Sequence, residues 1–476
     1  QNFSKFLGLA FLSRPMVLVL ILVVLLSTSF ANYALTTKTT NIIYGSAPYL
    51  TFDGGRTQVT NTEALLRISL SDGRTFTPTT NDSSFFNPIV LPVAGQSSTD
   101  IGMLVPTDTN SIALSSLIGT PYNYWGDDDG DGQGVNGVTA TGSLNLSIVD
   151  KFNNPVARNE VLTICKAPYR LTLSNGEGTL KTRYGVPNES RFSASNASYY
   201  IKPKTAPVIC YAQPDSHYGN GIYAGPASIW NPDWGFLPQS VTPSSYGLNF
   251  PTTGANNLLF DLDIGGVSEA LSWAPVSHSG ITATMINSTR YHIHVTLTGP
   301  VAKDYQLRSD NPGEIARPSL PQVFELVGRD SSGNAVVKYG FELKQWFVNR
   351  GYSYKTHSNM ESWCNKIGYR LPKVSDLTNA SCQGNNSEKC GDYANEIVGA
   401  TPSAPNNSYM RHMGAGFFAE WGRVEYYLVT FFFGGDYWTQ DRAGSSQEFF
   451  TVDSAYGWVG HADREYTNVR GLCVYP

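Results

Sequence analysis

The sequence predicts a mainly β protein, in which tandem immunoglobulin-like β-sandwich domains are followed by a small α+β domain. The 476 residues are enough for about three domains of ~150 residues each. Charged residues make up only 15%, whereas 45 Gly, 27 Pro and 27 Tyr favour sheets joined by turns. Short apolar runs that alternate with polar residues and end at turn residues recur along most of the chain.

The charge balance argues against nucleic acid and anionic lipid as partners. Lys and Arg number 33 and Asp and Glu number 38, which gives a net charge of −5. Binding to phosphate backbones or anionic headgroups requires a basic surface. We therefore expect a partner of another class.

Residues 1–31 have the features of a secretory signal peptide. Lys5 and Arg14 precede the apolar run Met16 to Leu26, and the small residues Ser29 and Ala31 mark a cleavage site before residue 32. The apolar run is too short for a ~30 Å hydrocarbon core, so we favour cleavage over an uncleaved anchor. The chain is expected to be exported and to have no membrane span after cleavage.

Four regions are predicted after the signal peptide. They are an N-terminal β domain (32–120), a β region with an immunoglobulin-like sandwich (121–255), a second β-sandwich (256–339) and the α+β domain (340–476). Alternating apolar residues predict strands at 65–70, 144–148, 258–264, 291–297, 323–327 and 335–339. The last two runs flank a turn at residues 331–334 and predict a hairpin.

The C-terminal region has a different pattern. Ser358 and Glu361 form a capping box, and apolar residues at helical spacing from Met360 to Ile367 predict a helix that ends at Gly368. The segment from Tyr426 to Phe433 is apolar on both faces, which predicts a central strand covered on both sides.

The cysteines are expected to form disulfides, because the chain is predicted to be exported and contains no C-x-x-C pair. Six cysteines allow fifteen sets of three pairs. Proximity within the predicted domains favours three pairs: Cys165 with Cys210, Cys382 with Cys390, and Cys364 with Cys473.

Several segments resemble a known family of bacterial surface proteins. The sequences YNYWG (122–126), YAGPASIWNPDWGFLPQS (223–240) and NFPTTG (249–254) resemble the adhesion domain of enterobacterial intimin- and invasin-like adhesins. Near the C-terminus, GYRLP (368–372) and VRGLCV (469–474) resemble a C-type-lectin-like domain. The resemblance covers about residues 117–476. It implies β-sandwiches that present a lectin-like recognition domain, on a chain that is extracellular or associated with the outer membrane at the bacterial surface.

An acidic loop matches the start of a calcium-binding loop. Asp127, Asp129 and Asp131 occupy the first, third and fifth positions, and Gly132 the sixth. The twelfth position is Val138, so the bidentate Glu of an EF-hand is missing. A structural calcium ion is the one cofactor that the sequence suggests, and a solvated acidic turn is the alternative.

The C-terminal domain lacks the Glu-Pro-Asn, Gln-Pro-Asp and Trp-Asn-Asp triplets of sugar-binding C-type lectins, which disfavours calcium-dependent glycan recognition. Recognition would then depend on aromatic and arginine side chains at a protein interface. The residues predicted for this role are Tyr437, His461, Arg464 and Tyr466. Trp438 and Trp458 are expected in the core.

No catalytic motif supports an enzymatic function. The sequence has no Gly-x-Ser-x-Gly elbow, His-Glu-x-x-His motif or phosphate-binding Gly-rich loop. His292 and His294 share one face of a predicted strand, but no third metal ligand is evident nearby. The sequence therefore predicts a non-enzymatic adhesin that binds a host cell-surface protein or glycan through its C-terminal domain. The alternatives are a carbohydrate-binding module and a secreted enzyme on a lectin-like scaffold, which would need a reactive cysteine pair.

Overall fold

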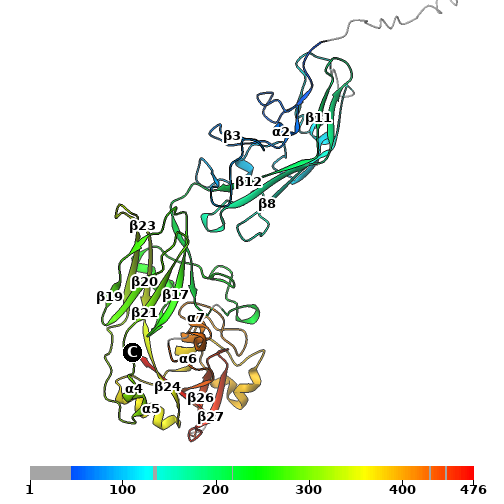
Figure 1. The fold of residues 1–476 in the computed structure, drawn as a ribbon. Coiled ribbons are helices and arrows are strands. Elements are labelled where there is room, and N and C mark those ends of the chain that lie inside the picture. Colours follow the sequence, from blue (N-terminus) through cyan, green and yellow to red (C-terminus); the bar gives the residue numbers. More distant parts are fainter. Residues whose placement is uncertain (1–43, 132–136, 217, 428–429, 445–446) are drawn as a thin grey trace, which may run out of the picture. The chain divides into compact units, whose positions relative to one another are not determined.

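The computed structural model describes residues 44–131, 137–216, 218–427, 430–444 and 447–476 (Figure 1). The predicted signal peptide and Gly132 lie outside these residues. The chain divides into two compact units. Unit 1 contains the chain up to Arg67, Met103–Asn145 and Ser174–Asn196, and unit 2 contains Ile68–Gly102, Leu146–Leu173 and Ala197–Pro476. Within the described residues, no helix is both long and apolar enough to cross a bilayer.

Unit 1 is built from short strands and two single-turn helices. Strands β1 (Tyr49–Leu50) and β6 (Trp125–Gly126) form an antiparallel pair. A three-stranded sheet has the order β11 (Glu189–Phe192), β10 (Gly178–Thr182), β7 (Val138–Thr141). The helices are α2 (Thr62–Leu65), which the Asn61 side chain caps by accepting from the Ala64 N–H, and α3 (Leu114–Leu117).

A five-stranded sheet corrects the predicted domain boundary at residue 120. Its order is β4 (Ile89–Val90), β12 (Ser195–Lys202), β9 (Tyr169–Asn175), β8 (Ser143–Val149), β5 (Ser111–Ala113). Strands β4 and β5 come from the region expected to fold separately, yet β4 pairs with β12 and β5 pairs with β8. Residues 32–120 are therefore not an independent domain, because their strands complete a sheet formed by later residues.

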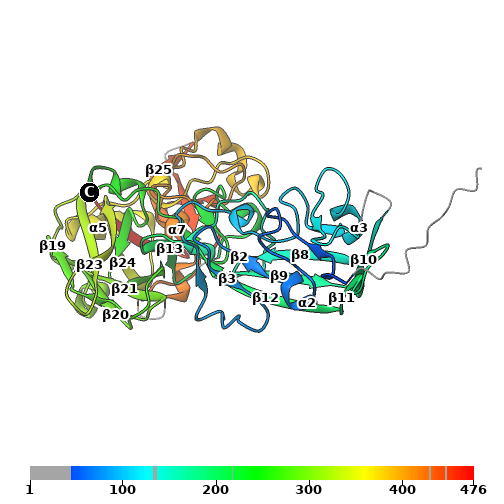
Figure 2. The ribbon, with the colours of Figure 1, turned by 90° about the horizontal axis from the view of Figure 1, so that it is seen from above.

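Two sheets of unit 2 form a β-sandwich. The first has the order β14 (Trp230–Asn231), β15 (Gly235–Phe236), β13 (Val208–Pro214), β17 (Leu258–Gly265), β21 (His292–Thr298), β20 (Ile281–Ile286), β19 (Val276–His278). The second has the order β18 (Ser272–Trp273), β22 (Gln322–Arg329), β23 (Ala335–Leu343). The rings of Phe260 on β17 and Phe341 on β23 lie 6.0 Å apart, so the sheets pack face to face (Figures 1 and 2).

The four strands predicted between residues 258 and 339 are confirmed as β17, β21, β22 and β23. The predicted boundary at residue 255 is wrong, because β13 lies in the same sheet as β17 and pairs with it over Val208–Pro214. This sandwich therefore begins near residue 208. Unit 2 also contains a two-stranded antiparallel pair, β2 (Ile68–Ser69) with β3 (Thr75–Phe76).

The C-terminal domain combines one sheet with short helices, as predicted. The sheet order is β16 (Thr253–Ala255), β24 (Gln345–Tyr354), β28 (Arg470–Tyr475), β25 (Asp436–Ala443), β26 (Glu448–Asp453), β27 (Val459–Asp463). The helices are α4 (Asp304–Arg308), α5 (His357–Lys366), α6 (Val374–Leu377) and α7 (Phe417–Trp421). The described chain as a whole also contains short 3-10 helices: η1 (Ser98–Asp100), η2 (Ile164–Lys166), η3 (Gly221–Tyr223), η4 (Pro243–Leu248), η5 (Ser387–Glu396) and η6 (Val424–Tyr426).

Helix α5 confirms the predicted helix and changes its start. Met360, Trp363 and Cys364 are buried on one face, and Gly368 follows the helix with φ +87°. The helix begins at His357, so the predicted capping box lies inside its first turn. The strand predicted from Tyr426 to Phe433 is wrong: η6 ends at Tyr426, and the described residues that follow are coil.

The sandwich and the C-terminal domain share one hydrophobic core. Phe250 stacks on Phe236 at 4.8 Å, contacts Phe260 at 5.4 Å and packs on Trp421 of α7 at 4.8 Å. The carboxylate of Glu420 fixes the neighbouring backbone, because it accepts bonds from the backbone and hydroxyl groups of Thr252 and Thr253 at 2.6–3.2 Å. The hydrophobic core therefore continues across the predicted boundary between residues 339 and 340.

All three predicted disulfides are confirmed. Cys165–Cys210 joins η2 to β13, and Cys364–Cys473 joins α5 to β28. Cys382–Cys390 joins the coil before η5 to η5 itself and closes a short loop. None of the six cysteines is free.

We expect acid to destabilise the C-terminal domain through His357. This side chain is 3% exposed, its Nε2 donates to the Thr439 carbonyl at 2.9 Å, and its ring stacks on Phe449. Burial lowers the pKa of His357 below its usual value of 6.5. As the pH falls, the unfolded chain therefore takes up this proton before the folded chain does. The contribution of neutral His357 to the free energy of unfolding is complete above pH ~6.5 and is lost below it. The loss is at most about 1.4 kcal/mol per pH unit.

The test is urea unfolding at pH 7, 6 and 5 of the native chain and of His357→Gln, which keeps a donor but does not titrate. The difference between the two unfolding free energies should decrease as the pH falls. Parallel curves would contradict the assignment to His357.

Candidate functional site

Aromatic side chains, several of them exposed, surround two arginines on the C-terminal domain. We call this group the aromatic–arginine surface. Its members are Tyr352, Tyr354, Arg423, Tyr426, Phe433 and Arg470, together with the exposed Phe431, which lies two residues before Phe433 in the chain. Strand β24 carries the first two, β28 begins at Arg470, and the others lie in or next to η6 and the coil before β25. The exposed fractions are 68% for Tyr352, 70% for Phe431 and 56% for Tyr426.

Arg470 organises one half of this surface. Its guanidinium carbon lies 4.4 Å from the ring centroid of Tyr354, 5.3 Å from Phe433 and 5.4 Å from Tyr352. Its Nη2 donates to the Tyr354 hydroxyl at 2.6 Å, and its Nε donates to the Gly434 carbonyl at 3.0 Å. The rings of Tyr352 and Phe433 are 5.2 Å apart. A cation held under several rings keeps those rings in one arrangement.

Arg423 organises the other half. Its guanidinium carbon lies 4.4 Å from the ring of Tyr218 and 4.5 Å from that of Tyr456, and its Nη1 donates to the Tyr426 hydroxyl at 3.0 Å. The two halves meet at Gly434, whose carbonyl binds Arg470 and whose backbone lies against Glu425. A Cβ atom added to Gly434 would be 3.7 Å from the carboxyl carbon of Glu425. Burial raises the pKa of Glu425, which favours its neutral form.

Arg423 supplies unneutralised positive charge to this surface, whereas Arg470 is only 6% exposed and lies beneath the rings. Among the described residues, neither Arg423 nor Arg470 forms an ion pair with a carboxylate. Nε of Arg423 and Nη1 of Arg470 are buried donors without a hydrogen-bond partner. The arrangement is suited to a protein ligand that presents acceptor groups, above all carboxylates.

The residues predicted for binding lie elsewhere in the domain. Tyr437 is 2% exposed and donates from its hydroxyl to the Phe433 carbonyl at 2.8 Å, so it supports the surface from the core and is not part of it. His461 on β27 contacts Tyr393 and Glu448. Arg464 pairs with Glu465 at 3.2 Å, and Tyr466 is 52% exposed. Trp438 is buried, as predicted, and Trp458 is half-buried beneath Lys389.

Sequence reasoning missed the aromatic–arginine surface for an identifiable reason. The pattern from Tyr426 to Phe433 predicts a covered central strand, in which the aromatic side chains would be hidden. The useful signal was the alternation of Tyr352 and Tyr354 at the end of β24, which places both side chains on one face beyond the core.

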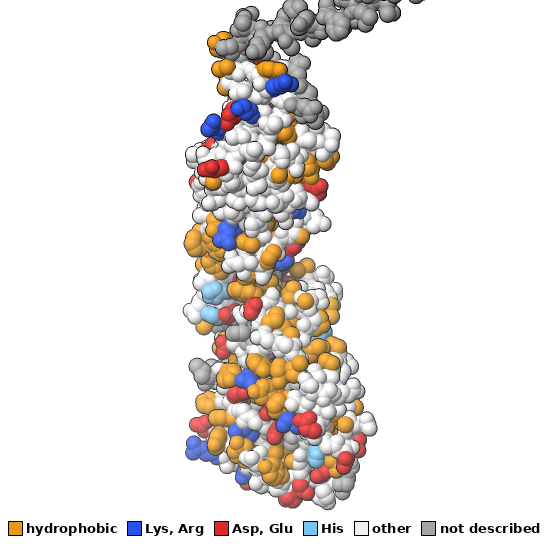
Figure 3. Space-filling view, turned by 90° about the vertical axis from the view of Figure 1, so that its right-hand side faces the viewer, with side chains coloured by type: hydrophobic (Ala, Val, Ile, Leu, Met, Phe, Trp, Pro, Cys, Tyr) orange, Lys and Arg blue, Asp and Glu red, His pale blue; other side chains and the backbone are white. Residues whose placement is uncertain are grey.

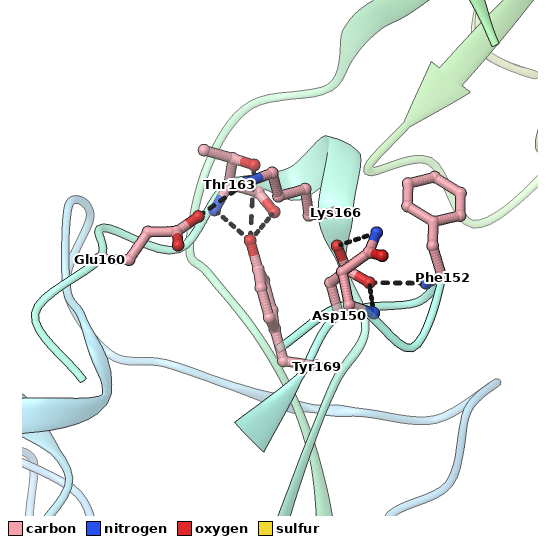
Figure 4. Close-up of polar contacts among 7 residues, drawn as sticks. Asp150, Phe152, Glu160, Thr163, Lys166 and Tyr169 are labelled. Carbon is pink, nitrogen blue, oxygen red and sulfur yellow. Dashed lines mark hydrogen bonds and ion pairs between the residues drawn. The ribbon is translucent and has the colours of Figure 1, made fainter. Parts of the chain in front are cut away.

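A cavity of about 530 Å³ in unit 2 is a second candidate site. Its lining includes Phe152 and Trp234, whose rings lie 4.8 Å apart, and Asp263, whose pKa is raised by burial. Asp150 holds Phe152 in place by accepting from its backbone N–H at 2.9 Å (Figure 4). Lys151 lies 4.9 Å from the Phe152 ring centroid and 3.7 Å from the Asp263 carboxylate.

Tyr169 and Lys166 hold the loop beyond that turn. The Tyr169 hydroxyl accepts from the Thr163 N–H at 2.8 Å and donates to the Thr163 carbonyl at 3.1 Å, and Lys166 pairs with Glu160 at 2.7 Å (Figure 4). This side of the cavity is therefore held by the chain's own polar contacts.

The predicted histidine pair lies at this cavity. His292 lines it, and its ring is 5.3 Å from that of His294, as expected for one face of β21. His294 pairs with Asp261 on the adjacent strand β17. Within the described part of the chain, the one cluster of ligand-type side chains with metal-site geometry is Asp127, Asp129 and Asp131, whose oxygens lie within 4.8 Å of one another.

Charged side chains of both signs are interspersed among hydrophobic ones on the face drawn in Figure 3. On that face there is no broad field of a single sign among the described residues, in keeping with the net charge of −5.

Comparisons with known proteins give a distant likeness. No protein-family model and no curated protein matches the chain. The solved structure of invasin, a bacterial integrin-binding protein, is 13% identical with a TM-score of 0.33, covering 72% of this chain and 52% of that one. A 282-residue C-terminal fragment of intimin, in complex with the intimin-binding domain of the translocated intimin receptor, is 12% identical with a TM-score of 0.31, covering 71% and 93%.

An intimin mutant of EHEC O157:H7 is 13% identical with a TM-score of 0.27, covering 47% of this chain and 88% of that one. The chain spans about half the length of the invasin structure. At these TM-scores the likeness carries no argument about the function or the site of this chain.

Proposed function

We propose that the chain is an exported bacterial adhesin that attaches to host cells by recognising a surface protein through its C-terminal domain. The observation that carries this proposal is the aromatic–arginine surface. Tyrosine and arginine are enriched among the residues that dominate binding energy at protein interfaces, and exposed aromatic rings held by a cation need little further ordering on binding. Arg423 is half-buried and forms no ion pair among the described residues, so its charge favours an acidic segment of the receptor.

Three features are consistent with this assignment. The residue motifs quoted above resemble bacterial adhesins, the fold is mainly β, and the domain at the C-terminus is closed by Cys364–Cys473. The alternative of an enzyme on a lectin-like scaffold loses support, because its chemistry would need a reactive thiol and all six cysteines are bonded.

The decisive experiment measures binding of the purified chain to host epithelial cells. Tyr352→Ala combined with Phe431→Ala should weaken binding at least about tenfold, because both rings are exposed and outside the core. Tyr466→Ala is the matched control, since it removes another exposed ring of the same domain, and it should bind as the native chain does. The melting temperature of each variant confirms folding, and a calcium chelator should leave binding unchanged.

A glycan-binding function is the second candidate, because the cavity beside Phe152 and Trp234 offers aromatic faces next to Asp263. Its signature is competition by free glycans and loss of binding on Trp234→Ala. If the Tyr352/Phe431 variant binds normally while these two results are seen, the protein-receptor proposal is overturned in favour of glycan recognition.

A further inference from the structure

We propose that unit 1 contains a calcium site formed by Asp127, Asp129 and Asp131. The three carboxylates each place an oxygen within 4.8 Å of the others. Calcium binds carboxylate oxygens in flexible geometries, and alternate residues of a short loop are a usual source of its ligands. The proposal is independent of the adhesin function and concerns a different part of the chain.

Asp131 provides the observation that an acidic turn does not explain. Asp131 is only 2% exposed, and both of its carboxylate oxygens are buried without a hydrogen-bond partner. Oδ2 of Asp129 is likewise buried and unpartnered. Among the described residues, no Lys, Arg or His forms an ion pair with either of these two side chains. A buried carboxylate normally has a hydrogen-bond partner or a counter-ion. The carboxylates of Asp129 and Asp131 therefore lack the positive charge that would compensate for their burial.

Asp128 shows that the loop separates two kinds of carboxylate. Its Oδ1 accepts from the Tyr49 hydroxyl at 2.8 Å, and its Oδ2 accepts from Nε2 of Gln58 at 2.9 Å. Asp128 is exposed and satisfied, while its neighbours at positions 127, 129 and 131 converge. The alternation is that of a cation-binding loop, because ligands come from every second residue.

The backbone of two glycines from distant segments of the chain lies against these carboxylates. A Cβ atom on Gly45 would lie 1.6 Å from Oδ2 of Asp129, and one on Gly185 would lie 1.4 Å from Oδ2 of Asp131. The two segments are joined by a hydrogen bond from the Gly45 N–H to the Val186 carbonyl at 3.2 Å. Calcium takes six to eight oxygens, so backbone carbonyls and water would complete the set in place of the missing twelfth-position Glu.

Calcium would therefore join three segments of unit 1, those around Gly45, Asp129 and Gly185. Without the ion, the three carboxylates repel one another, and with it they hold the segments together. The consequence is a calcium-dependent increase in the stability of this unit.

The test is a calcium titration of the full chain, purified in chelator, by calorimetry and by melting temperature. The native chain should bind one Ca²⁺ with a Kd of ~10⁻⁴–10⁻³ M or tighter, as extracellular modules do. Asp131→Asn should weaken binding at least about tenfold, because it removes one charged ligand from a set of three. Asp128→Asn, in the same loop, should change the affinity less than about twofold, since this carboxylate is used by Tyr49 and Gln58.

Melting temperatures distinguish a metal site from a folding defect. In chelator, Asp131→Asn should melt at a higher temperature than the native chain, because it relieves repulsion between carboxylates. In excess calcium the order should reverse. Absence of binding up to 10 mM calcium (roughly ten times the weakest Kd expected of such modules), equal stabilisation by magnesium, or an unchanged order of the two melting temperatures would each overturn the proposal.

Discussion

Replacement of Arg411 by methionine should lower the free energy of unfolding by about 3–5 kcal/mol, because the backbone carbonyl groups that its guanidinium binds would lose their donor. Arg411 has no exposed surface. Its Nε donates to the Tyr218 carbonyl at 2.8 Å, its Nη1 to the Glu420 carbonyl at 2.6 Å, and its Nη2 to the Ser216 carbonyl. Burial lowers the pKa of Arg411, and the carbonyl oxygens replace the water molecules that its guanidinium loses in the core.

Arg411 also connects segments that are distant in the sequence. Its guanidinium carbon stacks 4.6 Å from the ring of Trp230, and its own backbone N–H donates to the Tyr223 carbonyl at 2.9 Å. The substitution should therefore release the segment from Ser216 to Trp230 from the C-terminal domain, and protease sensitivity there should increase.

Urea unfolding at pH 7 measures the effect. Arg464→Met is the matched control, since the Arg464 side chain is 40% exposed and pairs with Glu465 at the surface, and it should stay within about 0.5 kcal/mol of the native chain. A loss below about 1 kcal/mol for Arg411→Met would show that water replaces the guanidinium without cost.

Removal of the Cys364–Cys473 disulfide should cost about 5 kcal/mol, the loop-entropy value for a sequence separation of 109. Both cysteines are buried, and the bond joins helix α5 to strand β28. The unfolded chain without this bond gains far more freedom than the folded chain, because the closed loop contains most of the C-terminal domain. The double variant to alanine avoids unpaired thiols.

The Cys382–Cys390 disulfide supplies the comparison. Its sequence separation is 8, so the same relation gives about 2–3 kcal/mol for its removal. Denaturant unfolding of the two double-alanine variants should reproduce this order. Equal losses would mean that local packing around the sulfur atoms, and not chain entropy, sets the contribution of each bond.

The motifs that resemble the adhesin family have structural roles in this chain. Trp230 stacks on Arg411, and Thr252 and Thr253 of the NFPTTG segment donate to the buried carboxylate of Glu420. Asn249 of the same segment accepts from the Gln239 N–H at 2.7 Å and donates to the Gly340 carbonyl at 2.8 Å. Trp230, Thr252 and Thr253 hold the sandwich to the C-terminal domain, and Asn249 holds its own segment to β23, so these motif residues act in packing.

The sequence alone predicts the fold class, the strands β17, β21, β22 and β23, the helix α5 and the three favoured disulfide pairs. These features follow from local periodicity, turn residues and the expected compartment, which a linear pattern contains. It also placed Asp127, Asp129 and Asp131 at spacings that the folded loop brings together.

The pairing of the strands and the exposure of individual side chains depend on tertiary packing. Strand β4 joins β12, and β13 joins β17, because pairing depends on packing between segments that alternate in the same way and so look alike in sequence. Tyr437 is buried while Tyr352 is exposed, although both are tyrosines on strands of one sheet. Burial depends on what covers each face of a strand, and that is set by distant parts of the chain.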